Sequence, residues 1–303
     1  MGVNAATARY LIAARKAGVS FERTLTLGRQ WLFADRARIN AWLEEAGLPV
    51  MPAPSVSEAP WADDLFRALG ARELDVLDNS DYEGARLIHD LNKPLPDDAG
   101  GRYDFVFDGG VIEHVFHASV AWQTCMRLAR TGGHVCSCSI ANNECGHGFY
   151  QFSPELFFRL FDASNGFQLR SLLLEEQGLR GWRWYAVQDP AALQARVCCI
   201  NSLPLHLKVL ARKQRDDGGR LPDVQQADYQ RAWQGADAGM ATTGGTEQVQ
   251  ARQRVPFKRR LASLIPASLR GHAQHVYRTY LVTRLRNRRF YTPVAPDRIP
   301  FLP

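Results

Sequence analysis

Three short apolar segments that each end next to an aspartate constrain the fold of this chain most strongly. The segment ELDVLD ends at Asp78, ARLIH is followed by Asp90, and YDFVFD ends at Asp108. Their length and their β-branched and aromatic residues are typical of buried strands. Predicted helices precede the first of them and follow the last, and the alternation of strands and helices along the chain favours a parallel sheet. The sequence therefore predicts an α/β fold with acidic residues at the ends of neighbouring strands.

The rest of the chain continues this alternation. Helices are predicted over 5–17, 35–46, 61–70, 111–130 and 154–162, and strands over 23–27, 73–78, 85–89, 103–108, 134–140, 167–174 and, as a pair, within 195–211. We predict one domain over 1–213, then a polar, glycine-rich linker or mobile excursion over 214–250, and a basic helical tail over 251–303.

The positive charge of the chain is concentrated in this tail. The net charge is +6, but residues 251–303 alone carry +11 and the remaining residues carry −5. A basic amphipathic helix can lie on an anionic membrane or contact phosphate. Alternatively, its apolar stripe packs on the preceding domain and leaves the arginines in solvent.

Composition excludes several classes of protein. No segment approaches the roughly 20 apolar residues of a membrane span, and Arg9, Arg15 and Lys16 interrupt the only Ala-rich stretch near the N-terminus. The six cysteines stand mostly in apolar runs, unlike the framework of a disulfide-rich secreted protein. We therefore expect a cytoplasmic protein, with peripheral membrane contact as an option for the tail.

The motifs LDVLDNSDYEGARLIHDLNKPLP, YDFVFDGGVIEHVFH and RTGGHV together resemble class I S-adenosylmethionine-dependent methyltransferases. EHVF and GHGFYQFSPELF resemble stretches of bacterial members in particular. The resemblance covers residues 20–212 and implies a Rossmann-like, mostly parallel seven-stranded sheet flanked by helices. It also implies S-adenosylmethionine as the cofactor.

The resemblance assigns cofactor-binding roles to residues after the first three strands. Asp78 would accept hydrogen bonds from the ribose hydroxyls, or alternatively cap a following helix. Asp90 would bind the adenine amino group beside Leu91, or alternatively start an Asx turn. After the first strand, the chain has only Gly28 where the family has several glycines, so Arg29 or Gln30 would bind the cofactor carboxylate.

The segment after the fourth strand would meet the methionine end of the cofactor and the acceptor. It contributes Asp108, Gly109 and Glu113 to the cofactor site. His114 is a candidate general base, since an imidazole titrates near neutral pH; the alternative is that it packs on the cofactor. His147, in the glycine-rich segment after the next strand, is a second candidate base, with a loop histidine bound to backbone as the alternative.

No metal site is predicted. Cys136, Cys138, Cys145 and His147 contain ligand types, but Cys136 and Cys138 alternate along an apolar strand, where cysteines usually pack as hydrophobes. The predicted activity is O- or N-methylation of a small-molecule or glycan acceptor. The alternative is a binding module that has lost catalysis, motivated by the glycine-poor first loop. The DGGV segment argues against nucleic acid as the substrate.

Overall fold

The computed structural model describes residues 2–54, 60–179, 181–216, 220, 222, 224–240, 276 and 283–302. The chain forms two compact units. The first comprises Met1–Ala186, Leu203–Val224 and Pro293–Pro303, and the second comprises Val187–Ser202 and Gln225–Thr292. The acidic strand ends and both candidate bases belong to the first unit.

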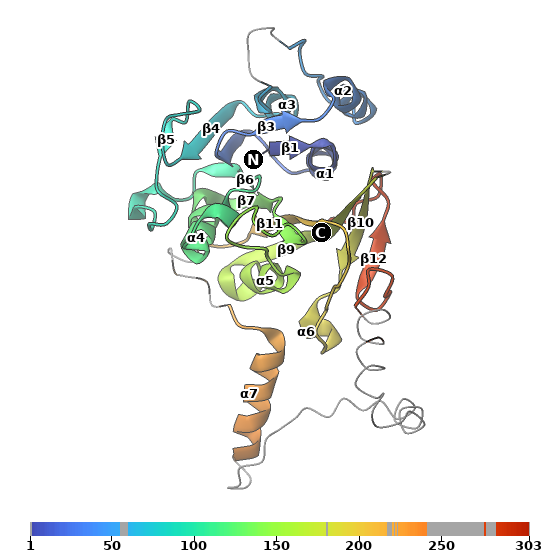
Figure 1. Ribbon diagram of the computed structural model, residues 1–303. Coiled ribbons are helices and arrows are strands. Elements are labelled where there is room, and N and C mark those ends of the chain that lie inside the picture. Colours follow the sequence, from blue (N-terminus) through green and yellow to red (C-terminus); the bar gives the residue numbers. More distant parts are fainter. Residues whose placement is uncertain are drawn as a thin grey trace. The chain divides into compact units, whose positions relative to one another are not determined.

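Five parallel strands form the half of the main sheet that carries the predicted cofactor residues (Figure 1). Their order across the sheet is β5-β4-β2-β6-β7, with parallel pairing at every step. Their bounds are β2 Arg23–Leu27, β4 Glu73–Asp78, β5 Leu87–Ile88, β6 Tyr103–Asp108 and β7 Ala129–Ser137. In this order β2, the first of the five parallel strands along the chain, lies between β4 and β6. This position is the switch point of a doubly wound fold.

The sheet continues with an antiparallel strand inserted beside β7. This strand, β11, pairs antiparallel with both β7 and β9, so β9 runs in the same direction as the five parallel strands. The order ends with β10 and β12, and β8 pairs with β11 off this path. The bounds are β8 Ile140–Asn142, β9 Phe167–Gly178, β10 Gly181–Val187, β11 Leu205–Lys213 and β12 Tyr291–Val294.

The α/β Rossmann-like prediction is confirmed, but the predicted count of seven strands is wrong. The described residues place ten strands in this sheet. The three additional strands are β8, β10 and β12. β10 forms a hairpin with β9 in the register Gly181↔Gly178. The predicted pair of strands within 195–211 is also wrong, because β11 is the only strand in that range.

Several helices begin where a side chain accepts a hydrogen bond from one of their first free N–H groups. Asn4 caps α1 by accepting from Thr7 N at 2.8 Å, and Asp35 caps α2. The helices are α1 Ala5–Lys16, α2 Arg36–Glu45, α3 Asp63–Ala68, α4 Ala118–Leu128, α5 Pro154–Leu160, α6 Pro190–Leu193 and α7 Ala227–Met240, with 3-10 turns η1 Asp97–Ala99, η2 Ile112–His114 and η3 Ala163–Asn165. The helix predicted over 111–130 is therefore η2 followed by α4.

Two short strands form a second sheet that is separate from the main one. β1 (Gly2–Asn4) and β3 (Trp31–Phe33) pair in parallel. The core that they join is built from α1 and the sheet, with Tyr10, Leu11 and Phe107 fully buried. Nothing in the sequence pattern predicts β1 or β3, because each is only three residues long.

The predicted linker and tail differ locally from the structure. Residues 227–240, inside the predicted linker, form α7, and residues 291–294, inside the predicted helical tail, form β12. Most of the basic tail lies outside the described residues, so its predicted membrane contact stays a prediction. No described helix is long and apolar enough to cross a membrane.

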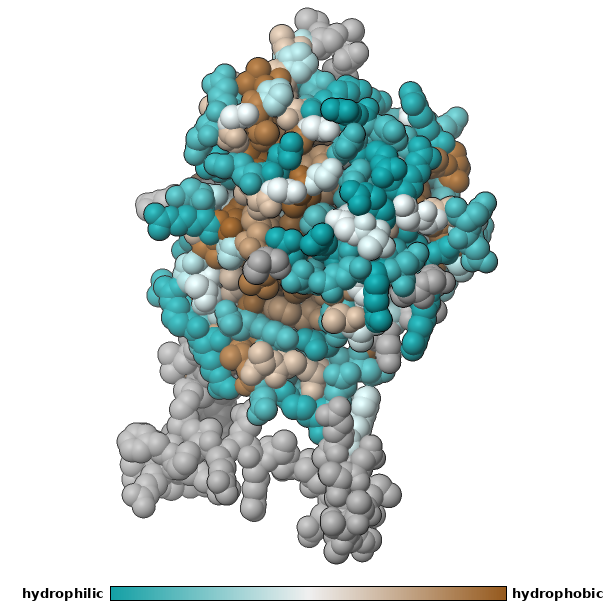
Figure 2. Space-filling view, turned by 180° about the vertical axis from the view of Figure 1, so that it is seen from behind, coloured by the Kyte–Doolittle hydropathy of each residue, from teal (hydrophilic) through white to brown (hydrophobic). Residues whose placement is uncertain are grey.

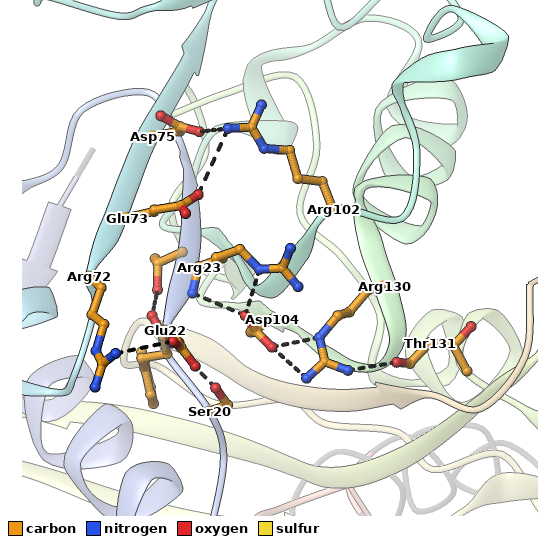
Figure 3. A network of polar contacts seen from close by, with 12 residues as sticks. Ser20, Glu22, Arg23, Arg72, Glu73, Asp75, Arg102, Asp104, Arg130 and Thr131 are labelled. Carbon is orange, nitrogen blue, oxygen red and sulfur yellow. Dashed lines mark hydrogen bonds and ion pairs between the residues drawn. The ribbon is translucent and has the colours of Figure 1, made fainter.

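The amino-terminal ends of the strands carry a network of ion pairs (Figure 3). Asp104 is almost fully buried and accepts from Arg23 Nε at 3.2 Å and from Arg130 Nε at 2.6 Å. Burial alone would raise the pKa of Asp104, but hydrogen bonds from Arg130 and Arg23 hold it below its ordinary value. Asp75 accepts from the Tyr103 hydroxyl at 2.8 Å. Because this network lies at the opposite ends of the strands from Asp78 and Asp108, we assign it a structural role.

His134, in β7, makes stability depend on pH. Burial, together with Arg170 and Arg212, lowers its pKa to about 4. The unfolded chain takes up a proton below about pH 6.5, whereas the folded chain does so only near pH 4. The free energy of unfolding is therefore expected to decrease as the pH falls from about 6.5 to about 4. At 1.36 kcal/mol per pKa unit, the loss is up to about 3 kcal/mol. Urea unfolding at pH 7 and pH 4.5 checks this, and His134→Leu should lose clearly less stability over the same range than the wild type. Equal losses in both proteins would contradict the assignment.

Candidate functional site

The strand ends that carry the predicted cofactor residues lie along one edge of the sheet. Leu27 is in register with Leu77 on one side and with Asp108 on the other, and Asp78 is in register with Ile88. We call this the carboxyl edge and define it by the residues that follow β5, β4, β2, β6 and β7. Ligands of doubly wound folds bind beyond this edge, at the switch point.

The loop after β2 differs from the usual phosphate- or cofactor-binding turn. Gly28 has φ +62°, a left-handed conformation that favours glycine, and its N–H donates to Leu77 O at 2.8 Å. In a dinucleotide-binding fold the first strand leads directly into a helix whose N-terminus faces the ligand. Here β2 leads into β3, and the next helix begins only at Arg36. The carboxyl edge therefore has no helix N-terminus directly after its first strand.

Arg29 is engaged with the protein rather than free for a ligand. Its guanidinium forms an ion pair with Asp63, with Nη2 and Oδ2 2.8 Å apart, and lies 4.7 Å from the ring centre of Trp61. Its Nη1 also contacts Glu83 O at 3.4 Å. Arg29 thus ties the first loop to the start of α3, and its predicted contact with a cofactor carboxylate would have to compete with Asp63.

Gln30 is buried at the switch point, and its side-chain oxygen faces Gly109, which follows β6. Its amide nitrogen donates to Leu27 O at 2.7 Å and Gly28 O at 3.2 Å, so it is not free to bind a carboxylate. Its Oε1 is buried and has no hydrogen-bond partner among the described residues. A Cβ on residue 109 would lie 2.0 Å from this oxygen, so Gly109 is needed for the close contact. The orientation of Gln30 suits a ligand that donates a hydrogen bond.

Asp78 is the last residue of β4 and is half-buried. Its Oδ1 accepts from Asn79 N at 2.6 Å, and its Oδ2 has no partner among the described residues. The alternative of a helix cap is wrong, because residues 79–86 form bends and turns rather than a helix. One carboxylate oxygen thus remains available at the carboxyl edge.

Asp90 forms the Asx turn that was the alternative to its cofactor role. Its Oδ1 accepts from Asn92 N at 3.0 Å and from Asn92 Nδ2 at 3.1 Å, and its Oδ2 lies 3.5 Å from Lys93 Nζ. The backbone hydrogen bond from Asn92 is the main cause that lowers the pKa of Asp90. Leu91 beside it is buried. The adenine contact of Asp90 stays a prediction.

Asp108 shapes the turn after β6. It is fully buried, and its Oδ1 accepts from Val111 N at 2.8 Å and Ile112 N at 3.3 Å. Its Oδ2 accepts from the Ser137 hydroxyl at 2.8 Å. Oδ1 therefore holds the turn before η2 and Oδ2 bonds the end of β7, which leaves the predicted cofactor contact of this segment to Gly109 and Glu113.

Glu113 is a buried carboxyl group whose charge is poorly compensated. It is 1% exposed, and its Oε2 has no hydrogen-bond partner among the described residues. Burial, and next the neighbouring Asp108, raise its pKa to about 8. A buried acid at the edge of a sheet with such a shift is typical of a functional group.

The two candidate bases lie together, although 32 residues separate them in the sequence. The ring centres of His114 and His147 are 5.2 Å apart, and both residues are exposed. Backbone bonds hold their segments together, because Phe149 N and Tyr150 N both donate to Glu113 O, at 2.8 and 3.1 Å. Burial, and then His147, lower the pKa of His114, which favours a neutral imidazole.

Glu144 is a part of this site that sequence analysis missed. Its Oε2 lies 3.6 Å from His147 Nδ1, and its Oε1 lies 2.7 Å from His206 Nε2. Glu144 could have been identified from its position three residues before His147 in the sequence. His206 could not, because it lies on β11 and only the fold brings it next to Glu144. Glu144 thus lies beside Nδ1 of His147, at an ion-pair distance that is too long for a hydrogen bond.

Large apolar side chains are exposed around the same segments. Phe116 and Phe149, which flank the two histidine segments, are 65% and 70% exposed, and Ile88 at the end of β5 is also exposed. Tyr150 supports this arrangement by donating from its hydroxyl to Phe116 O at 2.6 Å. On the face opposite to that of Figure 1, mostly hydrophilic side chains surround scattered apolar ones (Figure 2). Exposed aromatic side chains beside titratable groups suit an acceptor with apolar surface.

No protein-family model matches the chain, and no curated protein matches it. Among solved structures, the chain is similar to 1,6-didemethyltoxoflavin-N1-methyltransferase of Burkholderia thailandensis with bound S-adenosylhomocysteine, at 17% identity and a TM-score of 0.34 over 70% of this chain and 79% of that one. It is similar to the trans-methyltransferase CalH at 14% identity, TM-score 0.35, over 68% and 55%. It is also similar to the [4+2]-cyclase SpnF at 11% identity, TM-score 0.35, over 70% and 81%. TM-scores below 0.5 at such identities are too low to assign a family.

Proposed function

We propose that this chain is an S-adenosylmethionine-dependent methyltransferase that binds its cofactor along the carboxyl edge. The strand order is the observation that carries the proposal. A parallel set β5-β4-β2-β6-β7 is followed by antiparallel β11, which lies between β7 and β9. This order puts a switch point at β2, beyond which doubly wound folds bind nucleotide or nucleoside cofactors. The motifs that resemble the family lie on these strands.

The residues at the carboxyl edge fit this cofactor in two places. The free Oδ2 of Asp78 can accept from the ribose hydroxyls, and the unpartnered Oε1 of Gln30 can accept from the amino group of the methionine end. The cofactor supplies an activated methyl group on a sulfonium centre. The chain's own work is then to align the acceptor and to exclude water.

The acceptor would lie beside His114 and His147. His147 Nε2, opposite the nitrogen beside Glu144, would take the proton of a hydroxyl or amine acceptor, with His114 as the second candidate base. Phe116 and Phe149 support a small-molecule or glycan acceptor that presents an apolar or ring face. The proposed acceptor is a small molecule or a glycan, and the proposed reaction is O- or N-methylation. The family resemblance motivates both of these proposals.

Calorimetric titration of the full chain with S-adenosylmethionine and S-adenosylhomocysteine tests the proposal. We expect one site with a dissociation constant in the micromolar range, and a rise in Tm that grows with ligand concentration. No heat and no thermal stabilisation with either compound would contradict it.

A binding module without catalysis is the second candidate, and Gln30 favours it. Its side chain fills the space beside Gly109 at the switch point, and β3 follows β2 in place of a helix. On this alternative, Gln30 obstructs the position that the methionine end of the cofactor would occupy.

Gln30→Ala separates the two candidates. If Oε1 accepts a hydrogen bond from the cofactor, the variant should bind S-adenosylhomocysteine about 2- to 12-fold more weakly, since a hydrogen bond contributes about 0.5–1.5 kcal/mol. If the side chain obstructs the site, the variant should bind more tightly than the wild type. Isothermal calorimetry on both proteins measures the difference, with unfolding in urea as the control for stability.

A further inference from the structure

Three side chains with metal-ligating atoms converge beside the carboxyl edge. Glu113 and His114 come from η2, and His147 comes from the loop after β8. One ligand atom from each lies within 4.8 Å of the other two. Two imidazoles and one carboxylate form a donor set that suits divalent transition metals.

The backbone fixes these groups relative to one another. Besides the bonds from Phe149 and Tyr150 to Glu113 O, Gly148 packs directly on that carbonyl, because a Cβ on residue 148 would lie 2.8 Å from it. The loop that carries His147 is therefore held against η2 by close backbone contacts, which a side chain at position 148 would prevent. This close approach keeps His147 next to His114.

Glu113 provides independent evidence for a ligand. One of its carboxylate oxygens belongs to the cluster, its side chain is 1% exposed, and the described residues offer its Oε2 no hydrogen-bond donor. Leaving a carboxylate oxygen buried and unpartnered costs stability. A cation bound to this oxygen would offset that cost. Two histidines that act only as general bases would not.

A second layer of polar groups orients the histidine on the loop. Glu144 Oε2 lies 3.6 Å from His147 Nδ1, and Glu144 is itself held by His206 at 2.7 Å. His206 Nδ1 in turn lies 3.1 Å from Gln177 Nε2. Metal-binding histidines usually contact a carboxylate or carbonyl through their second nitrogen, which fixes the ring and raises its basicity.

We propose that Glu113, His114 and His147 bind one divalent transition-metal ion, such as Zn²⁺, through Glu113 Oε2, one nitrogen of His114 and His147 Nε2. Donor atoms about 2.1 Å from a tetrahedral centre lie about 3.4 Å apart, so both exposed histidine rings must rotate slightly inward to close the site. Three protein ligands leave at least one open position. If the proposed methyl transfer is correct, an acceptor oxygen would take that position, where the metal would lower its pKa and its proton would pass to solvent water. In the metal-bound protein, His147 and His114 would therefore act as ligands in place of general bases.

Metal titration of the full chain tests this proposal. After EDTA treatment and dialysis, we expect the wild type to bind one equivalent of Zn²⁺, and one of Co²⁺ with visible absorption bands. His147→Ala and Glu113→Gln should each weaken Zn²⁺ binding by at least about 10-fold, the loss typical when even an outer partner of a site is removed. His117→Ala changes an exposed histidine outside the cluster and should leave the affinity unchanged. Circular dichroism and Tm verify that each variant is folded.

Zn²⁺ binding that is absent, or that is equal in the wild type, His147→Ala and His114→Ala, would overturn the proposal. Titrating the metal-free wild type with S-adenosylhomocysteine keeps this result separate from the proposed function. The cofactor contacts of Asp78 and Gln30 need no metal, so cofactor binding without Zn²⁺ binding would refute the metal site alone. Zn²⁺ binding without cofactor binding would refute the methyltransferase proposal alone.

Discussion

Lys208→Met is expected to lower the free energy of unfolding by about 3–5 kcal/mol, the usual cost of breaking a buried ion pair by removing one partner. Lys208 on β11 and Glu175 on β9 are each 1% exposed, and their charged atoms are 3.0 Å apart. Burial works to raise the pKa of Glu175, but the Lys208 ammonium outweighs it and the pKa stays below its ordinary value. Without Lys208, the carboxylate would remain buried with its main counter-charge missing.

Urea unfolding at pH 7 measures this effect. The control is the double variant Lys208→Met/Glu175→Gln, which removes both charges and keeps an acceptor for Gln177, whose Nε2 lies 3.1 Å from Glu175 Oε1. The double variant should recover most of the lost stability, because neutral replacement of a buried pair is often tolerated. A single variant within about 1 kcal/mol of the wild type, the range of many exposed ion pairs, would show that the pair is not buried in solution.

Asp78→Ala is expected to weaken binding of S-adenosylhomocysteine by about 10–100-fold. A hydrogen bond to a charged group contributes about 1.5–3 kcal/mol, and 1.4 kcal/mol corresponds to a factor of ten in affinity. Asp78 is only half-buried and forms one backbone hydrogen bond, so its removal should leave the fold intact. Calorimetry on the wild type and the variant gives the ratio of dissociation constants.

Asp75→Asn is the matched control for this measurement. Asp75 lies on the same strand, β4, but it contacts Tyr103 and Arg102 in the network at the opposite edge. An asparagine can still accept from the Tyr103 hydroxyl, so the fold should tolerate it. We expect unchanged cofactor affinity for Asp75→Asn. Equal weakening in both variants would show that Asp78 acts through the stability of β4 and not by contacting the ribose.

The parallel half of the sheet could be predicted closely because its strands are buried and continuous in the sequence. The predicted bounds 23–27, 73–78 and 103–108 coincide with β2, β4 and β6. All residues of β6 are buried, which gives an apolar run that no surface helix would show. β5 is only two residues long, and its prediction over 85–89 was too long, because neighbouring Gly84 and the Asx turn at Asp90 limit the pairing.

The far edge of the sheet could not be predicted as well. β10 carries Trp182 and Trp184 in alternation, which is a strand signal, but its pairing with β9 depends on the hairpin at 178–181. β12 lies within residues 251–303, which were predicted to be a helical tail because of their helical periodicity with arginines on the outer face. Long-range pairing of this kind leaves little trace in a local pattern.

The site was predicted as a set of positions rather than as a set of contacts. The ends of β2, β4 and β6 do lie side by side along one edge, with Leu27 in register with both Leu77 and Asp108. The partners of each side chain were not predictable, because they come from distant segments: Asp63 for Arg29, Ser137 for Asp108, and Glu144 for His147. The prediction that the chain has no metal site was based on Cys136, Cys138, Cys145 and His147. It did not consider the group of Glu113, His114 and His147, which the fold brings together.

A crystal structure of the chain with S-adenosylhomocysteine tests the central claim most directly. We expect one bound molecule beyond the ends of β4, β2 and β6, with both ribose hydroxyls on the Asp78 carboxylate and the amino group near Gln30 Oε1. Density for the molecule elsewhere on the chain, or crystals that remain empty at saturating ligand, would contradict the claim that this edge binds the cofactor.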